Sequence, residues 1–343
     1  MYMAAGLPCL AGKGGVEMSR RRVQRLVAAA MAAVVCGALV SACGSSSSSS
    51  GAGKPTTLKV GVIPIADVAP LYLGVQKGFF KAQQLTIQPQ LAAGGAAIVP
   101  AVLSGSDQIG FSNTTSLIIA SSKGLPIQII SQGVLGGSSP KQAWDAVLVK
   151  KGSSIRTPKD LEGKTIAVNT LQNVGPLTIN TTLKQQGVDY TKVKYTEVEF
   201  PDMPAALESG RVDAAWMVEP FVSQAKAAGA TALLTPYEST APKLTVATYF
   251  ASKQYIQQNP DVIKRFVAAM NKSLEYAQTH AAEVRKIVLT YTKIPAQAAQ
   301  VITLPQWQAD LNRPTIDTTA TLAKQYGFVK SVPNVNDLIH QQQ

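Results

Sequence analysis

The sequence predicts an α/β protein of two lobes, and three observations lead to this prediction. Apolar, β-rich segments alternate with helical ones along most of the chain, as they do in α/β domains. A short motif occurs twice, in residues 100–111 and 204–216. Two apolar segments, near residues 146–151 and 244–251, are placed to carry the chain from one lobe to the other and back. Such a pair of crossings forms a hinge around which two lobes can close.

Each copy of the motif reads as helix, turn and strand. Pro100 and Pro204 stand where a helix can start without losing a hydrogen bond, and Gly105 and Gly210 accept the left-handed conformation of a helix exit. An Asp in a tight turn then leads into a short apolar strand. Ligands of open α/β sheets bind beyond the carboxyl ends of strands, so two such units predict a cleft between two lobes. The alternative is that a common local unit arises twice by chance.

The other elements follow from local signals in chain order. Strands are expected in β-rich segments bounded by Gly, Pro or polar turns, at residues 58–63, 85–91, 127–130, 146–149, 165–168, 195–198, 232–234 and 245–250. Helices are expected over residues 70–78, from Gly94 and Gly95 onward, near Pro176, and from Pro260 onward. In the last of these, apolar residues recur at i, i+3, i+4, i+7 and i+11, which indicates core packing.

The N-terminus is expected to be a processed leader. Four Arg between residues 20 and 25 precede an uncharged apolar run, residues 26–40, which is too short to span a membrane comfortably. The run ends in Val-Ser-Ala-Cys43, which resembles the lipobox of bacterial lipoproteins and implies cleavage before Cys43 and lipidation of its sulfur. The alternative is an ordinary signal peptide with an incidental Cys. Residues 1–17 do not resemble the start of a signal peptide, so Met18 is a candidate start of the chain beside Met1.

Length and composition fit this organisation. The chain has 343 residues, of which 46% are apolar and 15% charged, which is typical of a folded protein with two domains of about 150 residues each. We expect a signal peptide over residues 1–42 and a flexible Ser/Gly-rich tether over 43–55. Residues 56–147 together with 247–343 are expected to form the first lobe, and residues 148–246 the second.

Charge, cysteine and histidine exclude several classes of function. Removal of residues 1–42 takes away five of 32 basic and one of 20 acidic residues and leaves a net charge of +8, without a basic run that would favour nucleic-acid binding. Cys9 and Cys36 leave with the leader, so no disulfide is expected. His280 and His340 lie far apart and form no metal-ligand cluster or catalytic triad. We therefore expect no metal, no cofactor and no enzymatic activity.

Four segments carry a family resemblance. They are LYLGVQKGFFKAQQL (residues 71–85), the GG…SGSDQIGF segment (94–111), TPKDLEGKTIAV (157–168) and ALESGRVDAAWMVEPF (206–221). Together they resemble substrate-binding proteins of nitrate/sulfonate/taurine-type ABC transporters, a group that includes binders of the pyrimidine precursor of thiamine. The resemblance implies a type II periplasmic-binding-protein (Venus flytrap) fold with two crossover strands. It also implies an extracytoplasmic, lipid-tethered monomer that delivers a captured solute to a membrane permease.

The resemblance places the ligand site in the loops after the strands. Carried over by position, these residues are Ala66, Asp67, Gly94, Gly95, Ser112, Asn113, Thr114, Thr170, Leu171, Gln172, Asn173 and Glu219. Residues 112–114 and 170–173 precede helices, whose free N–H groups bind anionic groups such as sulfonate or carboxylate. Alternatively, these polar residues are plain N-caps.

Two carboxylates in these loops bear on the nature of the ligand. Glu219 and Asp67 each need a donor when buried, which an amine, an amidine or an aminopyrimidine would supply. The ligand is therefore expected to be zwitterionic, like taurine, or a nitrogen heterocycle, with Glu219 facing residues 112–114 across the cleft. Alternatively, Glu219 pairs with a Lys or Arg of the protein. Trp144 and Trp216 either stack on a flat ligand or belong to the core.

The resulting hypothesis is an extracytoplasmic solute-binding lipoprotein of an ABC importer. One alternative is an enzyme on the same fold, similar to pyrimidine synthases, which would need reactive His and Cys-rich iron-binding segments. The chain has no His in the named loops and keeps only Cys43 after processing. Another alternative is a lipoprotein that senses a ligand without transporting it.

Overall fold

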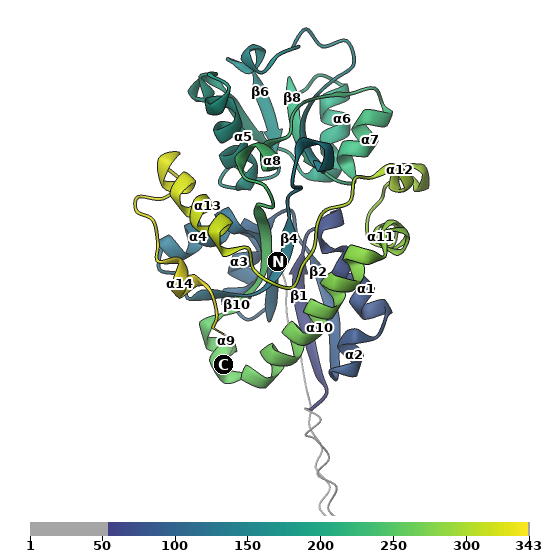
Figure 1. The fold of residues 1–343 in the computed structure, drawn as a ribbon, viewed down its shortest axis with the longest axis vertical. Helices are drawn as coiled ribbons and strands as arrows, with labels where there is room; N and C mark the ends of the chain where they lie inside the picture. Colours follow the sequence, from purple (N-terminus) through teal and green to yellow (C-terminus); the bar gives the residue numbers. More distant parts are fainter. Residues whose placement is uncertain (1–53, 342–343) are drawn as a thin grey trace, which may run out of the picture. The chain divides into compact units, whose positions relative to one another are not determined.

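The chain forms two five-stranded sheets, each flanked by helices (Figure 1). The computed structural model describes residues 54–341, so the expected signal peptide, Cys43 and nearly all of the tether lie outside the described part. The first sheet has the order β2 (Leu85–Leu91), β1 (Thr56–Val62), β3 (Ile109–Asn113), β10 (Thr245–Ser252) and β4 (Ile127–Leu135). The second has the order β7 (Lys194–Glu197), β6 (Thr165–Val168), β8 (Ala214–Val218), β5 (Asp145–Val149) and β9 (Thr231–Leu234).

The two sheets share one topology. In each, the second strand of the order pairs in parallel with both neighbours, as β1 does with β2 and β3, and β6 with β7 and β8. The fourth strand runs antiparallel to both neighbours in each sheet, β10 in the first and β5 in the second. The strands after the two motif copies, β3 and β8, hold the same place. The repeated motif therefore marks equivalent units, which confirms the predicted two-lobed α/β fold.

The helix exits of the two motif copies have the predicted geometry, but one helix start differs. Gly105 follows α3 (Gly95–Leu103) with φ of 77°, and Gly210 follows α6 (Met203–Glu208) with φ of 74°. Pro204 lies in the first turn of α6, whereas Pro100 lies inside α3. The expectation that Pro100 starts a helix is wrong, because Gly94 and Gly95 have already begun that helix five residues earlier.

The remaining helices cover the two sheets. They are α1 (Ala69–Gln76), α2 (Phe79–Ala82), α4 (Thr114–Ser122), α5 (Val174–Gln185), α7 (Phe221–Ala227), α8 (Pro236–Thr240), α9 (Lys253–Gln258), α10 (Pro260–Thr279), α11 (Ala281–Val288), α12 (Ala296–Val301), α13 (Arg313–Gln325) and α14 (Val335–Leu338). The longest of them, α10, packs on α1 and β4 (Figure 1). Its apolar stripe, including Ile263, Phe266 and Met270, is buried, as its spacing predicted.

The chain passes between the sheets in residues 136–144 and again in residues 235–244. The strand expected to lead out of the first lobe, β5, instead pairs along its length with β8 and β9 of the second sheet. Its five residues are all buried, so its backbone needs partners on both edges. β10 lies in the first sheet, between β3 and β4, as expected for the returning segment.

The C-terminal part contacts helices of both sheets. Helix α12 packs on α7 of the second sheet, while α13 packs on both α4 and α5. Between these helices, Gln306 forms an antiparallel bridge with Leu135 at the end of β4. The ring of Tyr326 contacts that of Tyr190, with centroids 5.1 Å apart. The segment that the sequence assigns to the first lobe therefore also contacts residues of the second sheet.

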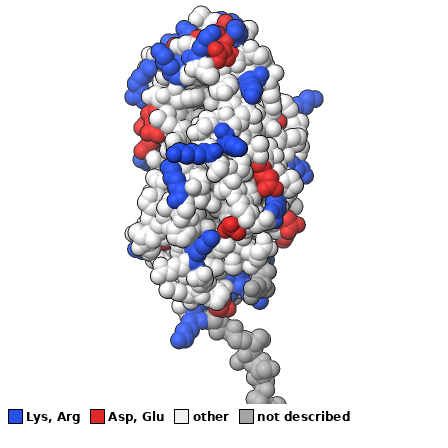
Figure 2. Space-filling model, turned by 90° about the vertical axis from the view of Figure 1, so that its left-hand side faces the viewer, with Lys and Arg blue, Asp and Glu red and all other residues white. Residues whose placement is uncertain are grey.

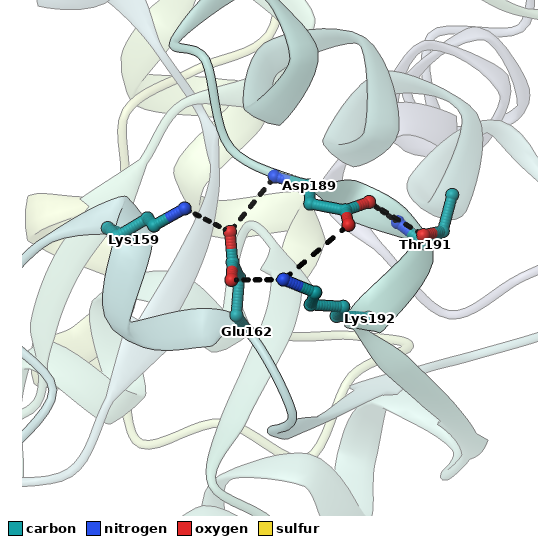
Figure 3. Close-up of polar contacts among 5 residues, drawn as sticks. All are labelled: Lys159, Glu162, Asp189, Thr191 and Lys192. Carbon is teal, nitrogen blue, oxygen red and sulfur yellow. Dashed lines mark hydrogen bonds and ion pairs between the residues drawn. The ribbon is translucent and has the colours of Figure 1, made fainter.

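Glu162 holds together the turn before β6, in the segment that reads TPKDLEG (Figure 3). Its Oε1 accepts from Lys159 Nζ at 2.5 Å and from the backbone N–H of Asp189 at 3.1 Å, while Oε2 pairs with Lys192 Nζ at 3.1 Å. These donors lower the pKa of Glu162 to about 2, Lys159 contributing most. Because the network precedes β6, it lies at the opposite end of that strand from loop 169–173.

Candidate functional site

The carboxyl ends of strands from both sheets surround one small cavity of about 20 Å³, which has room for about one water molecule. This volume is far below that of small-molecule pockets, about 300–1,000 Å³, so the closed cavity must widen to take a ligand. The first sheet contributes residues after β1, at the end of β3 and at the start of β10, and the second contributes residues after β6 and at the end of β8. The polar lining is Asp67, Asn113, Asn169 and Asn173, and the aromatic lining is Phe111, Phe200, Trp216 and Tyr237.

Asp67 is the carboxyl group of this cavity. It lies in a short 3-10 turn, Ala66–Val68, directly after β1, and only 3% of its surface is exposed. Its Oδ1 has no hydrogen-bond partner. Burial raises the pKa of Asp67 to about 8, with a smaller opposing effect from its own backbone N–H. A desolvated carboxyl without a cationic partner keeps its proton, which is the physical reason for this shift.

The side chains of residues 112–114 mainly form hydrogen bonds within the protein. Asn113 caps α4: its Oδ1 accepts from Ser116 N at 2.9 Å and its Nδ2 donates to Ser116 Oγ at 3.0 Å. Thr114 Oγ1 donates to Thr245 O at 2.7 Å, and Ser112 Oγ donates to Asn113 O at 3.3 Å. Of the three, Asn113 lines the cavity. The N-cap alternative therefore describes Asn113, without removing it from the site.

The loop after β6 divides into an inward and an outward part. Asn173 caps α5 through Gly175 N at 3.2 Å and donates to Asn169 Oδ1 at 2.6 Å and Thr170 Oγ1 at 2.7 Å. Leu171 and Gln172 are exposed, so the structure does not bring them to the cavity. Asn169, absent from the sequence-based set, lines it. The signal that could have found Asn169 is its position as the first residue after the strand.

Glu219 does not face the cavity as expected. Its Oε1 accepts from Ser223 Oγ at 2.7 Å and from Thr303 N at 3.1 Å, and its Oε2 accepts from Ser223 N at 3.1 Å. Burial raises the pKa of Glu219, and these donors oppose that shift. No Lys or Arg of the described residues forms an ion pair with it. The carboxylate instead holds the segment after α12 to the start of α7.

The loops of the two sheets touch at the edge of the cavity. Ala66 N donates to Glu219 O at 3.0 Å, Asn169 Nδ2 donates to Ala93 O at 3.3 Å, and Ser116 Oγ donates to Gln172 O at 3.3 Å. Each of these bonds joins a residue of one sheet's loops to one of the other's. The structure therefore shows the lobes closed on the cavity.

Gly94 lies at this contact, and a valine there should hinder closure. Its backbone is extended, but a Cβ would lie 3.0 Å from Asn169 Nδ2 and 3.1 Å from Thr170 Cγ2. We expect Gly94→Val to weaken ligand binding about tenfold, because overpacking costs about 1–3 kcal/mol. Calorimetric titration checks this, with the thermal midpoint of the empty variant as the control. Unchanged affinity would mean that the loops separate in the bound state.

Trp216 is both core and cavity wall, whereas Trp144 is core. Trp216 Nε1 donates to Asp145 Oδ2 at 2.9 Å, and its ring contacts Phe200 and Tyr237 with centroids 5.6 Å and 5.8 Å away. Trp144 Nε1 donates to Leu135 O at 3.0 Å, and Trp144 does not line the cavity. Trp307, which the sequence does not single out, donates its indole N–H to Asp67 O at 3.1 Å. It therefore fixes the backbone of the turn that carries Asp67.

Metal-ligating groups, helix hydropathy and surface charge of the described residues also bear on function. Within residues 54–341 no group of His, Cys, Asp and Glu is arranged to hold a metal ion. None of the helices in that same part of the chain has the length and hydropathy to cross a membrane. On the face drawn in Figure 2, Lys and Arg side chains are scattered among uncharged and acidic residues.

Fold and cavity together define a structural class, the two-lobed α/β proteins with a cavity at the strand ends between the lobes. The solved structures agree. The alkanesulfonate-binding protein SsuA from Xanthomonas axonopodis pv. citri bound to MOPS superposes with a TM-score of 0.69 at 18% identity, covering 82% of this chain and 96% of that one. The periplasmic nitrate-binding protein NrtA from Synechocystis PCC 6803 gives 0.71 at 14% identity, covering 84% and 86%. The chain has the periplasmic-binding-protein fold.

The chain belongs to the NMT1/THI5-like family, whose model matches residues 65–284. It is similar to the taurine-binding periplasmic protein of Escherichia coli, with 30% identity over 192 residues, 55% of this chain and 56% of that protein. It is also similar to the formylaminopyrimidine-binding protein of Halalkalibacterium halodurans, with 22% identity over 225 residues, 64% and 65% of the two chains. The chain thus spans between half and two thirds of the length of these curated relatives.

Proposed function

We propose that this chain is the solute-binding protein of an ABC importer and captures a small organic molecule between its two sheets. The observation that carries the proposal is the cavity at the strand ends, which is lined from both sheets and contains a buried carboxyl group without a partner. Such a group is costly in a merely structural role, because it is desolvated and unpaired. The family membership and the names of the relatives support the same function.

We further propose that the solute is taurine-like, sulfonate-like or aminopyrimidine-like. The relatives bind taurine and formylaminopyrimidine by their names, and the Asn113 and Asn173 side chains cap helices at the cavity. The lining offers amide groups and aromatic rings but neither Cys nor His among the described residues. This composition favours binding over catalysis. The bound solute would be passed to a permease in the cytoplasmic membrane.

The site we propose is smaller than the sequence-based set. Asp67, Asn113, Asn169 and Asn173 are the polar side chains in reach of a ligand. Ala66, Gly94, Gly95, Ser112, Thr114 and Thr170 shape the loops around it.

Ligand binding is tested by thermal unfolding of the protein without residues 1–43, followed by uptake. A true ligand at about 100 times its Kd should stabilise the fold by about 2.7 kcal/mol. The panel pairs taurine with ethanesulfonate, and aminopyrimidines with hydroxypyrimidines, beside nitrate. A strain that lacks the protein should then lose uptake of the stabilising compound. Normal uptake in that strain would contradict an import function and favour a sensor.

Lipid anchoring at Cys43 is a separate proposal. We expect Cys43→Ser to move the full-length protein from the membrane fraction to the soluble fraction, because the anchoring acyl chains would be lost. Fractionation followed by immunoblotting checks this. Ser45→Ala is the control, since it leaves the cysteine in place. Membrane retention of the Cys43→Ser protein would show that another segment anchors it.

A further inference from the structure

We propose that Asp67 selects the ligand: the cavity takes small molecules with a protonated nitrogen that pairs with the Asp67 carboxylate, and it rejects simple anions such as nitrate and alkanesulfonates. The inference rests on the proposed function and narrows its substrate class. It separates this chain from neighbours of the same fold that bind anions by name.

The first argument is the lack of a cation for Asp67 within the described protein. Asp67 is 97% buried, lines the cavity and has an Oδ1 without any hydrogen-bond donor. No Lys, Arg or His is among the described residues that line this cavity. A nitrate or sulfonate would therefore meet a carboxyl group without a compensating positive charge. A ligand ammonium or amidinium group supplies the missing partner.

The second argument is that the other buried carboxyl expected at the site is already satisfied. Glu219 accepts hydrogen bonds from Ser223 and Thr303, so it does not need a donor from the ligand. The cavity carboxyl with an unpartnered oxygen, Oδ1, is Asp67. Its backbone is held by Trp307, which donates to Asp67 O, and by the 3-10 turn in which it lies. The carboxyl group is thus positioned in advance, which favours specific pairing.

The third argument is the aromatic lining. Phe111, Trp216 and Tyr237 border the same cavity as Asp67. Aromatic faces attract cations and disfavour anions, because the ring face carries negative charge density. A carboxyl group together with ring faces is suited to an amine or to a protonated heterocycle. The same rings would exclude water from the ion pair and strengthen it.

Several titratable groups lie around Asp67. The phenols of Tyr237 in α8, Tyr249 in β10 and Tyr291 after α11 each have a pKa raised first by burial and further by the charge of Asp67. Asp145 and Glu238 also act on Tyr237. All five groups are neutral or negative near pH 7, so none of them compensates an Asp67 carboxylate. In the empty closed protein the pKa of Asp67 is about 8, so pairing with a cation requires loss of its proton.

The test uses methylammonium, guanidinium and trimethylammonium chlorides against sodium nitrate and ethanesulfonate at equal ionic strength. Binding is followed by thermal unfolding and by tryptophan fluorescence. We expect the cations alone to stabilise the wild type. Asp67→Asn should bind them about a hundredfold more weakly, because one partner of a buried charge pair is gone. Glu162→Gln, at the far end of β6, is the matched control and should behave as the wild type.

The pH profile provides a second readout. Cation affinity of the wild type should rise about tenfold per pH unit below pH 8 and level off above it, because the proton on Asp67 must leave first. Asp67→Asn should show a flat profile. Stabilisation by the anions in both proteins would overturn the inference and leave the binding function intact. Absence of any effect from the cations would also overturn the inference. Whether the protein serves an importer is tested separately, by the uptake experiment.

Discussion

Replacement of Trp216 by alanine should lower the free energy of unfolding by about 3–5 kcal/mol, the usual cost of truncating a buried tryptophan. Trp216 is 1% exposed and lies in β8, which pairs with β6 on one side and with β5 on the other in the second sheet. Its ring packs against Phe200 and Tyr237, so truncation opens a void in the core and in the cavity wall. Denaturant unfolding of the wild type and the variant measures the difference.

Trp216→Phe separates packing from the hydrogen bond. Phenylalanine keeps much of the ring but lacks the N–H that donates to Asp145 Oδ2 at 2.9 Å. We expect it to lose less stability than Trp216→Ala, about 1–3 kcal/mol, which is the cost of leaving a buried acceptor unpaired. Equal losses in the two variants would mean that the indole N–H, rather than the bulk of the ring, accounts for the effect. A loss below 1 kcal/mol in Trp216→Ala would contradict the assigned core role.

Asp145→Asn should make the protein more stable than the wild type at alkaline pH, by about 1–3 kcal/mol at pH 9. Asp145 is 1% exposed and adjoins Glu238, which is 7% exposed. Burial raises the pKa of Asp145, and the negative charge of Glu238 raises it further, while burial raises the pKa of Glu238. Glu238 Oε1 accepts from Gly137 N at 2.7 Å, but Oε2 has no partner. Asparagine removes the repulsion between the two buried carboxylates at alkaline pH.

The sign follows from proton linkage. Both carboxyl groups hold protons in the folded protein at pH values where the unfolded chain has already released them. The folded state therefore binds more protons from about pH 4 upward, and stability falls as the pH rises through the folded pKa values. Asp145→Asn removes one of these groups and should flatten the decline between pH 5 and 9.

The pKa of Asp67 is raised to about 8, so Asp67 also makes the stability fall as the pH rises. The control is therefore a comparison of the two single variants with the double variant. Asp67→Asn alone should remove its own share of the slope, and the double variant should keep only the smaller slope that Glu219 and Glu238 contribute. Thermal midpoints measured from pH 5 to 9 give the slopes. An Asp145→Asn slope equal to that of the wild type would show that the Asp145–Glu238 pair does not titrate as inferred.

Much of the architecture was predictable because it is encoded locally. Runs of β-rich residues placed β1, β2 and β10, and the Ser-Gly exits at Gly105 and Gly210 marked equivalent turns. The position of polar residues after strands also indicated the side of each sheet on which the cavity lies. Asp67, Asn113 and Asn173 were singled out in this way, and they line the cavity. Each of these signals depends on neighbours within a few residues, which a sequence displays directly.

What remained hidden depends on contacts between distant residues. Glu219 accepts from Thr303, 84 residues away, so the sequence could not show that this carboxylate was already satisfied. Asp67 is held by Trp307, 240 residues away. The sheet that β5 joins was equally ambiguous, since a buried strand reads the same in either lobe.

The sequence by itself determined that two similar α/β units present polar loops to each other, because strand periodicity, helix exits and turn residues are local properties. Only the tertiary structure decided which of the two candidate carboxyl groups lines the cavity and which is held by donors of the protein. That choice depends on desolvation and on the donors within reach, and both are set by segments that meet only when the chain has folded. Asp67 Oδ1 has no partner because no donor of the described residues reaches it. Glu219 is satisfied because Thr303, which follows α12, donates its backbone N–H to it.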